Sequence, residues 1–213
     1  MQAELERADG VLHEIVVDAA AGMAEAFQEL FLALEEVVHR PAGPYRGYKT
    51  DIWDGGFRVP FLVRWPDKIE AGRVSDQLIC LTDIFATLTE LMGEELHEWA
   101  GEDSVNQLPA FLNETEENLR TTMITQSNLG AMAIRHGDWK LIVDTVGSGG
   151  PRTPGAQPIV MAGPFQFFPS KVGQLYPIKR DPYEEHSLWN HEPEKVEALR
   201  LLLKEQIWTG RSR

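Results

Sequence analysis

The segment from Arg46 to Pro66 constrains the fold of this chain more than any other stretch of its sequence. Its first half places Lys49 close to a glycine and ends with the glycine pair Gly55-Gly56. Glycine permits positive φ angles and close approach of two backbones, so this half predicts a tight loop. The second half contains the mostly apolar run Val59–Arg64, which is bounded by turn residues and predicts a strand.

A helix is predicted soon after this strand. Thr82-Asp83 is suitable as its N-cap, and Gly93 is suitable as the residue that follows it. The apolar residues between these limits recur at helical spacing and are expected to be buried: Ile84, Phe85, Leu88, Leu91 and Met92. A strand, a turn and a helix in this order fit the last unit of a layered α/β sheet.

The pattern changes after residues 94–119, which are polar and irregular and are interpreted as a linker. Extended runs then alternate with turns, as in an antiparallel meander: Thr121–Thr125, Ala131–Arg135, Trp139–Val143 and, later, Leu175-Tyr176. A last helix is predicted from Pro193, which is favoured in a first turn, to Gly210. Its buried stripe comprises Val196, Leu199, Leu203 and Ile207, with Leu202. The expected shape is a small antiparallel sheet with a helix packed across it.

The predicted fold class is therefore α/β, or α+β overall, in four segments. Residues 1–38 are predicted to be an acidic helical segment, and their stretch 19–38 reads as one amphipathic helix, a possible contact for a protein partner. Residues 39–93 hold the strand–helix unit and residues 94–119 the linker. Residues 120–213 form the small sheet with its helix.

Charge is distributed unevenly along the chain. The net charge is −13, which argues against a general affinity for nucleic acid. Residues 1–36 hold nine acidic residues against Arg7, a net of −8, whereas residues 37–66 hold five cations against Asp51 and Asp54, a net of +3. The loop of Lys49 is therefore a basic island in an acidic protein. Such an island suits an anionic ligand, and it also suits a set of structural ion pairs.

Targeting signals are not visible in the sequence. No apolar run approaches the roughly 20 residues that span a bilayer, so no membrane partner is predicted. The start, Met1–Glu6, is acidic and lacks the basic region and apolar core of a signal peptide, and the sequence assigns no compartment. The single cysteine, Cys80, excludes an internal disulfide and is expected to be a buried core residue.

The loop of Lys49 has a chemistry of its own. A lysine ammonium is a compact cation that can contact an anionic oxygen and offset charge that develops there. Arg58 could pair with Asp54 or Asp51 and hold the loop in place. The competing interpretation is that Lys49 is simply solvated, as most loop lysines are.

The string from Arg46 to Pro66 resembles a segment of the type I sulfatases of the alkaline-phosphatase superfamily, near the end of their catalytic domain. The resemblance implies that Lys49 contacts the sulfate of a substrate. It also implies that the loop is supported by Arg46, Gly47, Asp54, Gly55, Gly56 and Arg58. Two positions differ from the family pattern, because Tyr45 replaces a leucine and Asp54 replaces a glutamate.

Further motifs extend this resemblance over about residues 39–213. They are Ala71–Asp76, Leu81–Leu88, the hairpin Ala133–Ile142, and the run from Leu175 to Asn190. The resemblance implies the C-terminal portion of a sulfuric ester hydrolase that acts on an aryl or carbohydrate sulfate. Residues 1–36 resemble no part of a sulfatase, and Gln126-Ser127 departs from the His-Ser common in related enzymes.

Several catalytic motifs of the sulfatases have no counterpart in the sequence. Their nucleophile is a formylglycine made from a C/S-x-P-x-R motif, and their Ca²⁺ is held by an Asp-Asp pair and an Asp-Asn-Gly sequence; none of these occurs here. His136, His186 and His191 have no partner at a ligand spacing, so no catalytic or metal-binding residue is predicted. The chain alone is therefore expected to be inactive. The alternatives are a non-catalytic module that binds a sulfated glycan or a protein, and one half of a split sulfatase.

Overall fold

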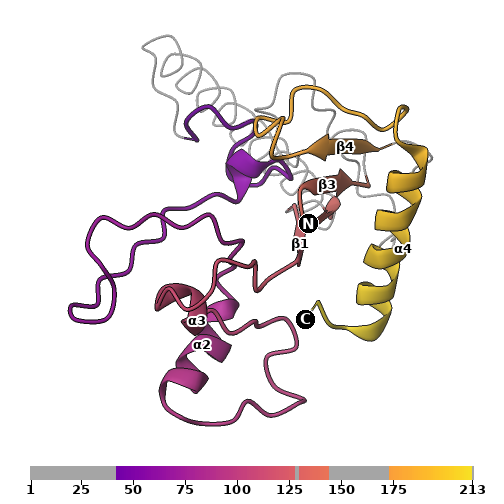
Figure 1. Cartoon of the computed structure of the whole chain (residues 1–213). Coiled ribbons are helices and arrows are strands. Elements are labelled where there is room, and N and C mark those ends of the chain that lie inside the picture. Colours follow the sequence, from indigo (N-terminus) through magenta and orange to yellow (C-terminus); the bar gives the residue numbers. More distant parts are fainter. Residues whose placement is uncertain (1–41, 128–129, 144–172, 213) are drawn as a thin grey trace, which may run out of the picture.

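The computed structural model describes residues 42–127, 130–143 and 173–212 (Figure 1). The acidic segment 1–38, with its predicted helix 19–38, lies outside the described residues. The described elements, in chain order, are the 3₁₀ turn η1 (Asp54–Gly56), helices α2 (Asp83–Leu91) and α3 (Leu108–Phe111), strands β1 (Thr122–Gln126), β2 (Met132–His136), β3 (Trp139–Ile142) and β4 (Gln174–Pro177), and helix α4 (Pro193–Thr209).

The antiparallel meander predicted from the sequence is confirmed. The four strands lie in the order β1-β2-β3-β4, and each neighbouring pair is antiparallel. Gly137, at φ +56°, allows the tight turn that pairs His136 with Trp139. Helix α4 begins at Pro193 and is closed by Gly210 at φ +67°, as predicted. The linker region contains one helical turn that the sequence analysis did not predict, α3.

The two faces of this sheet are covered by different parts of the chain. Side chains alternate between the faces of a strand, so neighbours in sequence enter different cores. On one face, α4 packs its residues Val196, Leu199 and Leu203 against Ile134, Leu141 and Leu175. On the other face, Ile52 and Trp53 of the Lys49 loop pack against Ala133, Ile142 and Tyr176. Figure 1 shows α4 running along one side of the sheet and the purple turn η1 on the opposite side. The loop is thus anchored in a core of its own.

The strand predicted at Val59–Arg64 does not form among the described residues. This segment is assigned no strand and has no backbone hydrogen bond to another described residue. Its apolar side chains are exposed: Val59 62%, Leu62 92% and Val63 44%. The local pattern is that of a buried strand, but a strand needs a neighbouring strand to complete its hydrogen bonds. The described residues hold no such neighbour for this segment.

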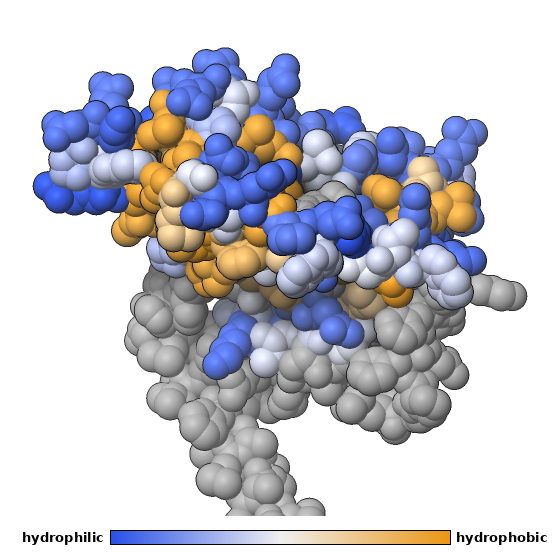
Figure 2. Space-filling model, turned by 90° about the horizontal axis from the view of Figure 1, so that it is seen from below, coloured by the Kyte–Doolittle hydropathy of each residue, from blue (hydrophilic) through white to orange (hydrophobic). Residues whose placement is uncertain are grey.

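Helix α2 forms where it was predicted, but its apolar stripe is not buried. Phe85, Leu88 and Met92 are 53%, 48% and 69% exposed, whereas the buried residues of the helix are Asp83, Ala86 and Thr87. Figure 2 shows the molecule from below, relative to Figure 1, and this face has an extensive apolar surface. The stripe has the helical spacing that predicted it but has nothing to pack against in the part of the chain described here. The helix is held instead through Asp83, which is fully buried.

Asp83 binds several groups that surround the start of α2. It pairs with Arg120, whose Nε donates to Asp83 Oδ2 at 2.9 Å, and it accepts the backbone N–H groups of Cys80 and Val105. Thr82 occupies the N-cap position, but its side chain does not cap the helix. Cys80 is half-buried rather than fully buried. In residues 42–127, 130–143 and 173–212, no helix has both the length and the apolar character that crossing a membrane requires.

Replacing Leu62 by lysine is expected to reduce self-association of the chain without changing its stability. Leu62 is 92% exposed, so the substitution removes no packing, and surface changes of this kind alter stability by about 0.5 kcal/mol or less. A charge on an unpaired extended segment blocks edge-to-edge pairing. Light scattering and a thermal melt measure the two effects. Leu141→Lys is the matched control, since a charge at this fully buried position should unfold the sheet. Unchanged association of Leu62→Lys would contradict the expectation.

Candidate anion-binding loop

Lys49 lies at the tip of a tight turn formed by Tyr48, Lys49, Thr50 and Asp51. The N–H of Asp51 donates to the carbonyl oxygen of Tyr48 at 2.9 Å, and Asp51 Oδ2 accepts the N–H of Tyr48, also at 2.9 Å. Thr50 has a φ of +93°, as the third residue of a type II turn requires. Lys49 is exposed, whereas Asp51 is 2% exposed. The buried carboxylate of Asp51 therefore closes the turn, while the side chain of Lys49 is exposed to solvent.

The glycine pair allows two backbone segments of this loop to pack closely against each other. A Cβ at Gly55 would lie 2.2 Å from the carbonyl oxygen of Gly47 and 2.6 Å from that of Arg46. A Cβ at Gly56 would lie 2.3 Å from the carbonyl oxygen of Asp51. Gly47 is buried and adopts φ +84°. These distances are below any that a real Cβ shows, so the loop as observed requires glycine at residues 55 and 56.

A buried cluster of charges fastens the loop to the sheet. Lys140, on β3, has its Nζ 2.8 Å from Asp54 Oδ1 and 2.8 Å from Glu184 Oε1. Glu184 Oε2 accepts the backbone N–H of Asp54 at 2.6 Å. Arg58 Nε donates to Asp54 Oδ2 at 3.0 Å, so of the two acids considered for Arg58 the structure selects Asp54. Two carboxylates and two cations thus balance, and three distant segments of the chain meet at one point.

The charges in this cluster have opposite effects on the two acids. Burial raises the pKa of Asp54, but attraction to Lys140 and then to Arg58 outweighs burial and holds that pKa below its ordinary value. Burial raises the pKa of Glu184 above its ordinary value, and Lys140 offsets only part of the rise. The ionised Asp54 therefore stabilises the fold above its ordinary pKa, and this stabilisation is lost as the pH falls through the lowered pKa. Ionisation of Glu184 instead costs stability as the pH rises through its raised pKa.

Arg46 and Trp53 form a second set of contacts with β4. Arg46 Nη1 donates to the hydroxyl oxygen of Tyr176 at 3.1 Å and to the carbonyl oxygen of Glu184 at 3.0 Å. Its guanidinium lies 4.0 Å from the ring centroid of Trp53, in a cation–π contact. Trp53 Nε1 and the Tyr176 hydroxyl both donate to Gln174 Oε1, at 3.0 and 2.6 Å. The polar groups under the loop are therefore paired with one another.

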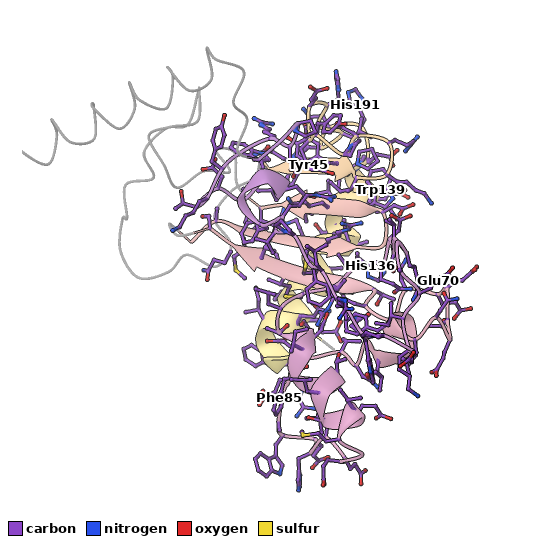
Figure 3. All side chains as sticks on the ribbon, turned by 90° about the vertical axis from the view of Figure 1, so that its left-hand side faces the viewer. Tyr45, Glu70, Phe85, His136, Trp139 and His191 are labelled. Carbon is purple, nitrogen blue, oxygen red and sulfur yellow. The ribbon has the colours of Figure 1, made fainter. Side chains whose placement is uncertain are left out.

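Tyr45, which stands where the family pattern has leucine, lies at the outer edge of the loop. The guanidinium of Arg58 lies 4.1 Å from its ring centroid, and the ring of Tyr183 lies 5.8 Å away. Figure 3 shows Tyr45 beside η1 above the sheet, with Phe85 of α2 at the opposite end of the molecule. The exposed Phe85 of α2 therefore lies far from the Lys49 loop.

Lys140, Glu184 and Gln174 were not identified as site residues by the sequence analysis. Their signal is present but weak: Lys140 is a charged residue inside a strand of apolar residues, Trp139–Ile142, and it is 3% exposed. Strand alternation places Lys140 on the face of Ile142, and Gln174 on the face of Tyr176. This is the face that the loop covers. Strand alternation could have shown which face of the sheet Lys140 and Gln174 occupy, but not which residues they contact there.

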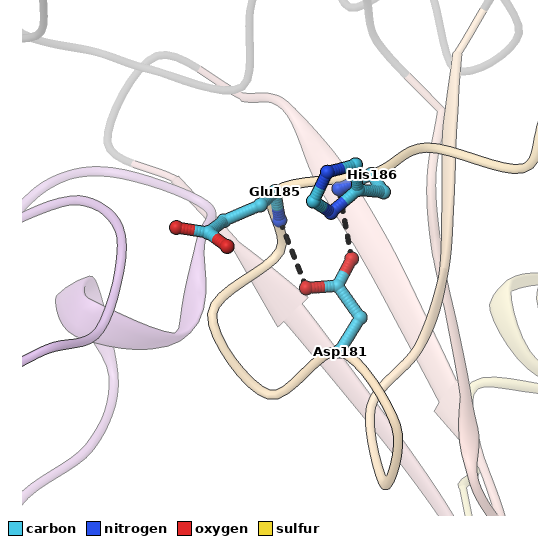
Figure 4. A group of neighbouring side chains, drawn as sticks. All are labelled: Asp181, Glu185 and His186. Atoms are coloured by element: carbon cyan, nitrogen blue, oxygen red, sulfur yellow. Dashed lines mark hydrogen bonds between the residues drawn. The ribbon is translucent and has the colours of Figure 1, made fainter.

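A second group of polar side chains lies in the turn that carries Glu184. Possible ligand atoms of Asp181, Glu185 and His186 lie within 4.8 Å of one another, so His186 does have carboxylates near it, which the sequence analysis did not predict. Both oxygens of Asp181 accept backbone N–H groups, from Glu185 at 3.0 Å and from His186 at 2.9 Å (Figure 4). These bonds close the turn and explain the cluster without a cation.

The sequence and the fold match known proteins. Residues 25–94 match the family model described as Sulfatase. The chain is 31% identical to the N-acetylgalactosamine-6-O-sulfatase of Bacteroides thetaiotaomicron over 166 residues, which are 78% of this chain and 30% of that protein. A solved structure from work on glycosaminoglycan metabolism by Bacteroides thetaiotaomicron has a TM-score of 0.62 and 30% identity. That match covers 78% of this chain and 32% of the other. This chain belongs to the sulfatase family.

The similarity covers the C-terminal part of the sulfatase relatives. The steryl-sulfatase of Rattus norvegicus is 32% identical over 167 residues, 74% of this chain and 29% of that protein. The chain thus spans about a third of the length of the sulfatases that it matches, and its antiparallel sheet with helices is the fold of that part. The family match begins at residue 25, so the prediction that residues 1–36 resemble no part of a sulfatase is wrong for residues 25–36.

Proposed function

We propose that this chain is the C-terminal portion of a sulfatase that hydrolyses an aryl or carbohydrate sulfate ester, and that Lys49 contacts the sulfate group. The observation that carries the proposal is the turn of Lys49. Its ammonium is exposed and has no ionic partner among the described residues, while Asp51 and Asp54, which follow it in the loop, are buried and paired. A fixed loop that leaves one cation free is suited to an anionic group.

The residues present do not form a calcium site of the sulfatase kind. Ca²⁺ requires several carboxylate or carbonyl oxygens that are free to bind it. Of the carboxylates at the loop, Asp54 pairs with Lys140 and Arg58, Glu184 pairs with Lys140, and Asp51 accepts the N–H of Tyr48. The sequence also lacks a C/S-x-P-x-R motif for formylglycine. We therefore assign no catalytic step to this chain and propose that it is inactive alone, although intact relatives are expected to use both groups.

The role of Lys49 can be tested by titrating the full chain with sodium sulfate, with sodium chloride at equal ionic strength as the reference. We expect saturable, sulfate-specific shifts of the backbone amide NMR signals of residues 48–51. Lys49→Ala should abolish these shifts, because it removes the exposed ammonium. Lys68→Ala is the matched control, since Lys68 is an exposed lysine in another loop. Shifts that persist in Lys49→Ala, or that never appear, would overturn this role.

The inactivity of the chain alone has a separate test. The full chain with Ca²⁺ should release no sulfate from 4-nitrophenyl sulfate or from a 6-O-sulfated N-acetylgalactosamine above the rate without protein. Measurable turnover that scales with protein concentration would contradict the proposal. A protein partner through the amphipathic stretch 19–38 is also part of the proposal, and loss of complex formation after truncation of that stretch would support it.

The exposed apolar surface favours a second candidate, one half of a split sulfatase. Val59, Leu62 and Met92 are among the side chains that a second polypeptide could cover. This candidate predicts turnover only when the missing part is supplied as a separate chain. The remaining candidate, a non-catalytic module, also predicts that the chain alone binds a sulfated glycan and loses this binding in Lys49→Ala, but it predicts no turnover when the missing part is supplied.

A further inference from the structure

Thr50 adopts a backbone conformation that is unfavourable for its side chain. Its φ of +93° lies in the region that glycine occupies freely and that β-branched residues rarely adopt. Strain of this kind persists only where the surrounding structure imposes it, and it is concentrated at functional sites. The third position of a type II turn is normally glycine or asparagine. A threonine there therefore needs a reason other than the stability of the turn.

The turn around Thr50 is anchored at its far end. Asp51 is 2% exposed and Ile52 is fully buried, so the chain after Thr50 cannot move freely. Asp51 also joins the two ends of the turn, because its N–H donates to the carbonyl oxygen of Tyr48 and its Oδ2 accepts the N–H of Tyr48, both at 2.9 Å. A type I turn would keep the first of these hydrogen bonds with a negative φ at its third residue, so this bond alone does not require the positive φ of Thr50.

The hydroxyl group of Thr50 supplies the second observation. Thr50 is half-buried, and its Oγ1 has no hydrogen-bond partner among the described residues. Thr50 directly follows Lys49 and lies on the same turn. Several other threonine side chains in the described parts of the molecule are paired; for example, Thr87 Oγ1 donates to the carbonyl oxygen of Asp83 at 2.6 Å. A hydroxyl without a partner beside an exposed ammonium is a free donor.

We propose that Thr50 is a second anion-binding residue, whose hydroxyl donates a hydrogen bond to the same oxyanion that Lys49 contacts. The ligand class is a tetrahedral oxyanion, a sulfate or sulfate ester, and the inference rests on the proposed function of Lys49. Serine would keep the donor, valine would keep the shape of the side chain without it, and glycine would remove both the donor and the strain.

Three variants of the full chain separate these contributions in the same sulfate titration. Thr50→Val should raise the dissociation constant of sulfate by about fivefold to tenfold, the effect of one hydrogen bond to a charged group. Thr50→Ser should stay within about twofold of the original chain, because the donor remains. Thr50→Gly should weaken binding as Thr50→Val does, but should raise the melting temperature by about 2 to 4 °C through release of strain.

The control and the contrary outcomes are defined by the same measurements. Asn113→Gly relaxes another positive φ, +63°, in a different loop, and should leave sulfate binding unchanged. If Thr50→Val binds sulfate like the original chain, the hydroxyl has no role and the proposal is overturned. If Thr50→Gly lowers the melting temperature, the claim of strain is overturned. Binding that is lost in Lys49→Ala but kept in Thr50→Val refutes this inference alone, whereas binding that is kept in Lys49→Ala refutes the role of Lys49 and this inference with it.

Discussion

Replacement of Lys140 by alanine is expected to lower the free energy of unfolding by about 3 to 5 kcal/mol. The substitution leaves Asp54 and Glu184 buried without the cation that lies 2.8 Å from each of them. Removing one partner of a buried ion pair has an effect of about this size, because an uncompensated charge remains in a site of low polarity. Urea-induced unfolding followed by circular dichroism measures the change. The Lys49 loop should be the first region to lose protection from hydrogen exchange.

The control for this experiment is Lys179→Ala. Lys179 follows β4 closely and is exposed, so its removal should change stability by about 0.5 kcal/mol or less. A second variant, Glu184→Gln, keeps the size of the side chain and leaves Lys140 paired with Asp54. It should therefore be milder than Lys140→Ala. A loss of less than about 1 kcal/mol in Lys140→Ala would mean that the cluster does not hold the loop.

Replacement of Gly55 by alanine is expected to be almost as damaging, with a loss of about 3 kcal/mol in the free energy of unfolding. The new Cβ would lie 2.2 Å from the carbonyl oxygen of Gly47, and a backbone atom cannot move aside as a flexible side chain can. The backbone around Gly55 must then move away from that of Arg46 and Gly47, which weakens the contact of Asp54 with Lys140. Chemical unfolding measures the loss. The sulfate-specific amide shifts of residues 48–51 should disappear with the loop.

Gly72→Ala is the matched control for Gly55→Ala. A Cβ at Gly72 would meet nothing within 4 Å, but the residue has a φ of +80°, so this variant measures the effect of conformation alone. That effect is about 1 kcal/mol. If the two variants lose the same stability, the close approach of Gly55 to Gly47 does not exist in solution, and the loop described here is wrong.

The C-terminal sheet and helix could be predicted from sequence because their signals are local. The short, mostly apolar runs of β2 and β3, the turn at Gly137, and the limits Pro193 and Gly210 of α4 depend only on residues close in the chain. The run Val59–Arg64 has an equally clear local signal, but a strand forms only with a partner. The described residues do not provide one, and the prediction failed for that reason.

The site could be predicted only in part. The glycine pair and Arg58 lie close to Lys49 in sequence, and the pairing of Arg58 with Asp54 spans only four residues. Lys140 and Glu184, in contrast, contact Asp54 across 86 and 130 residues of sequence. Nothing in the local pattern around a buried lysine or glutamate identifies a partner at such a distance. The strain at Thr50 was also invisible, because threonine is not a residue that suggests positive φ.

The most direct test of the account is a crystal structure of the full chain with bound selenate, which mimics sulfate and can be located by its anomalous scattering. The account predicts a selenate ion with one oxygen about 2.8 Å from Lys49 Nζ and another within hydrogen-bond distance of Thr50 Oγ1. The cluster of Asp54, Lys140 and Glu184 should be intact beneath it. Selenate bound only at other cations, such as Arg46 or Arg211, with the Lys49 turn empty, would contradict the central claim.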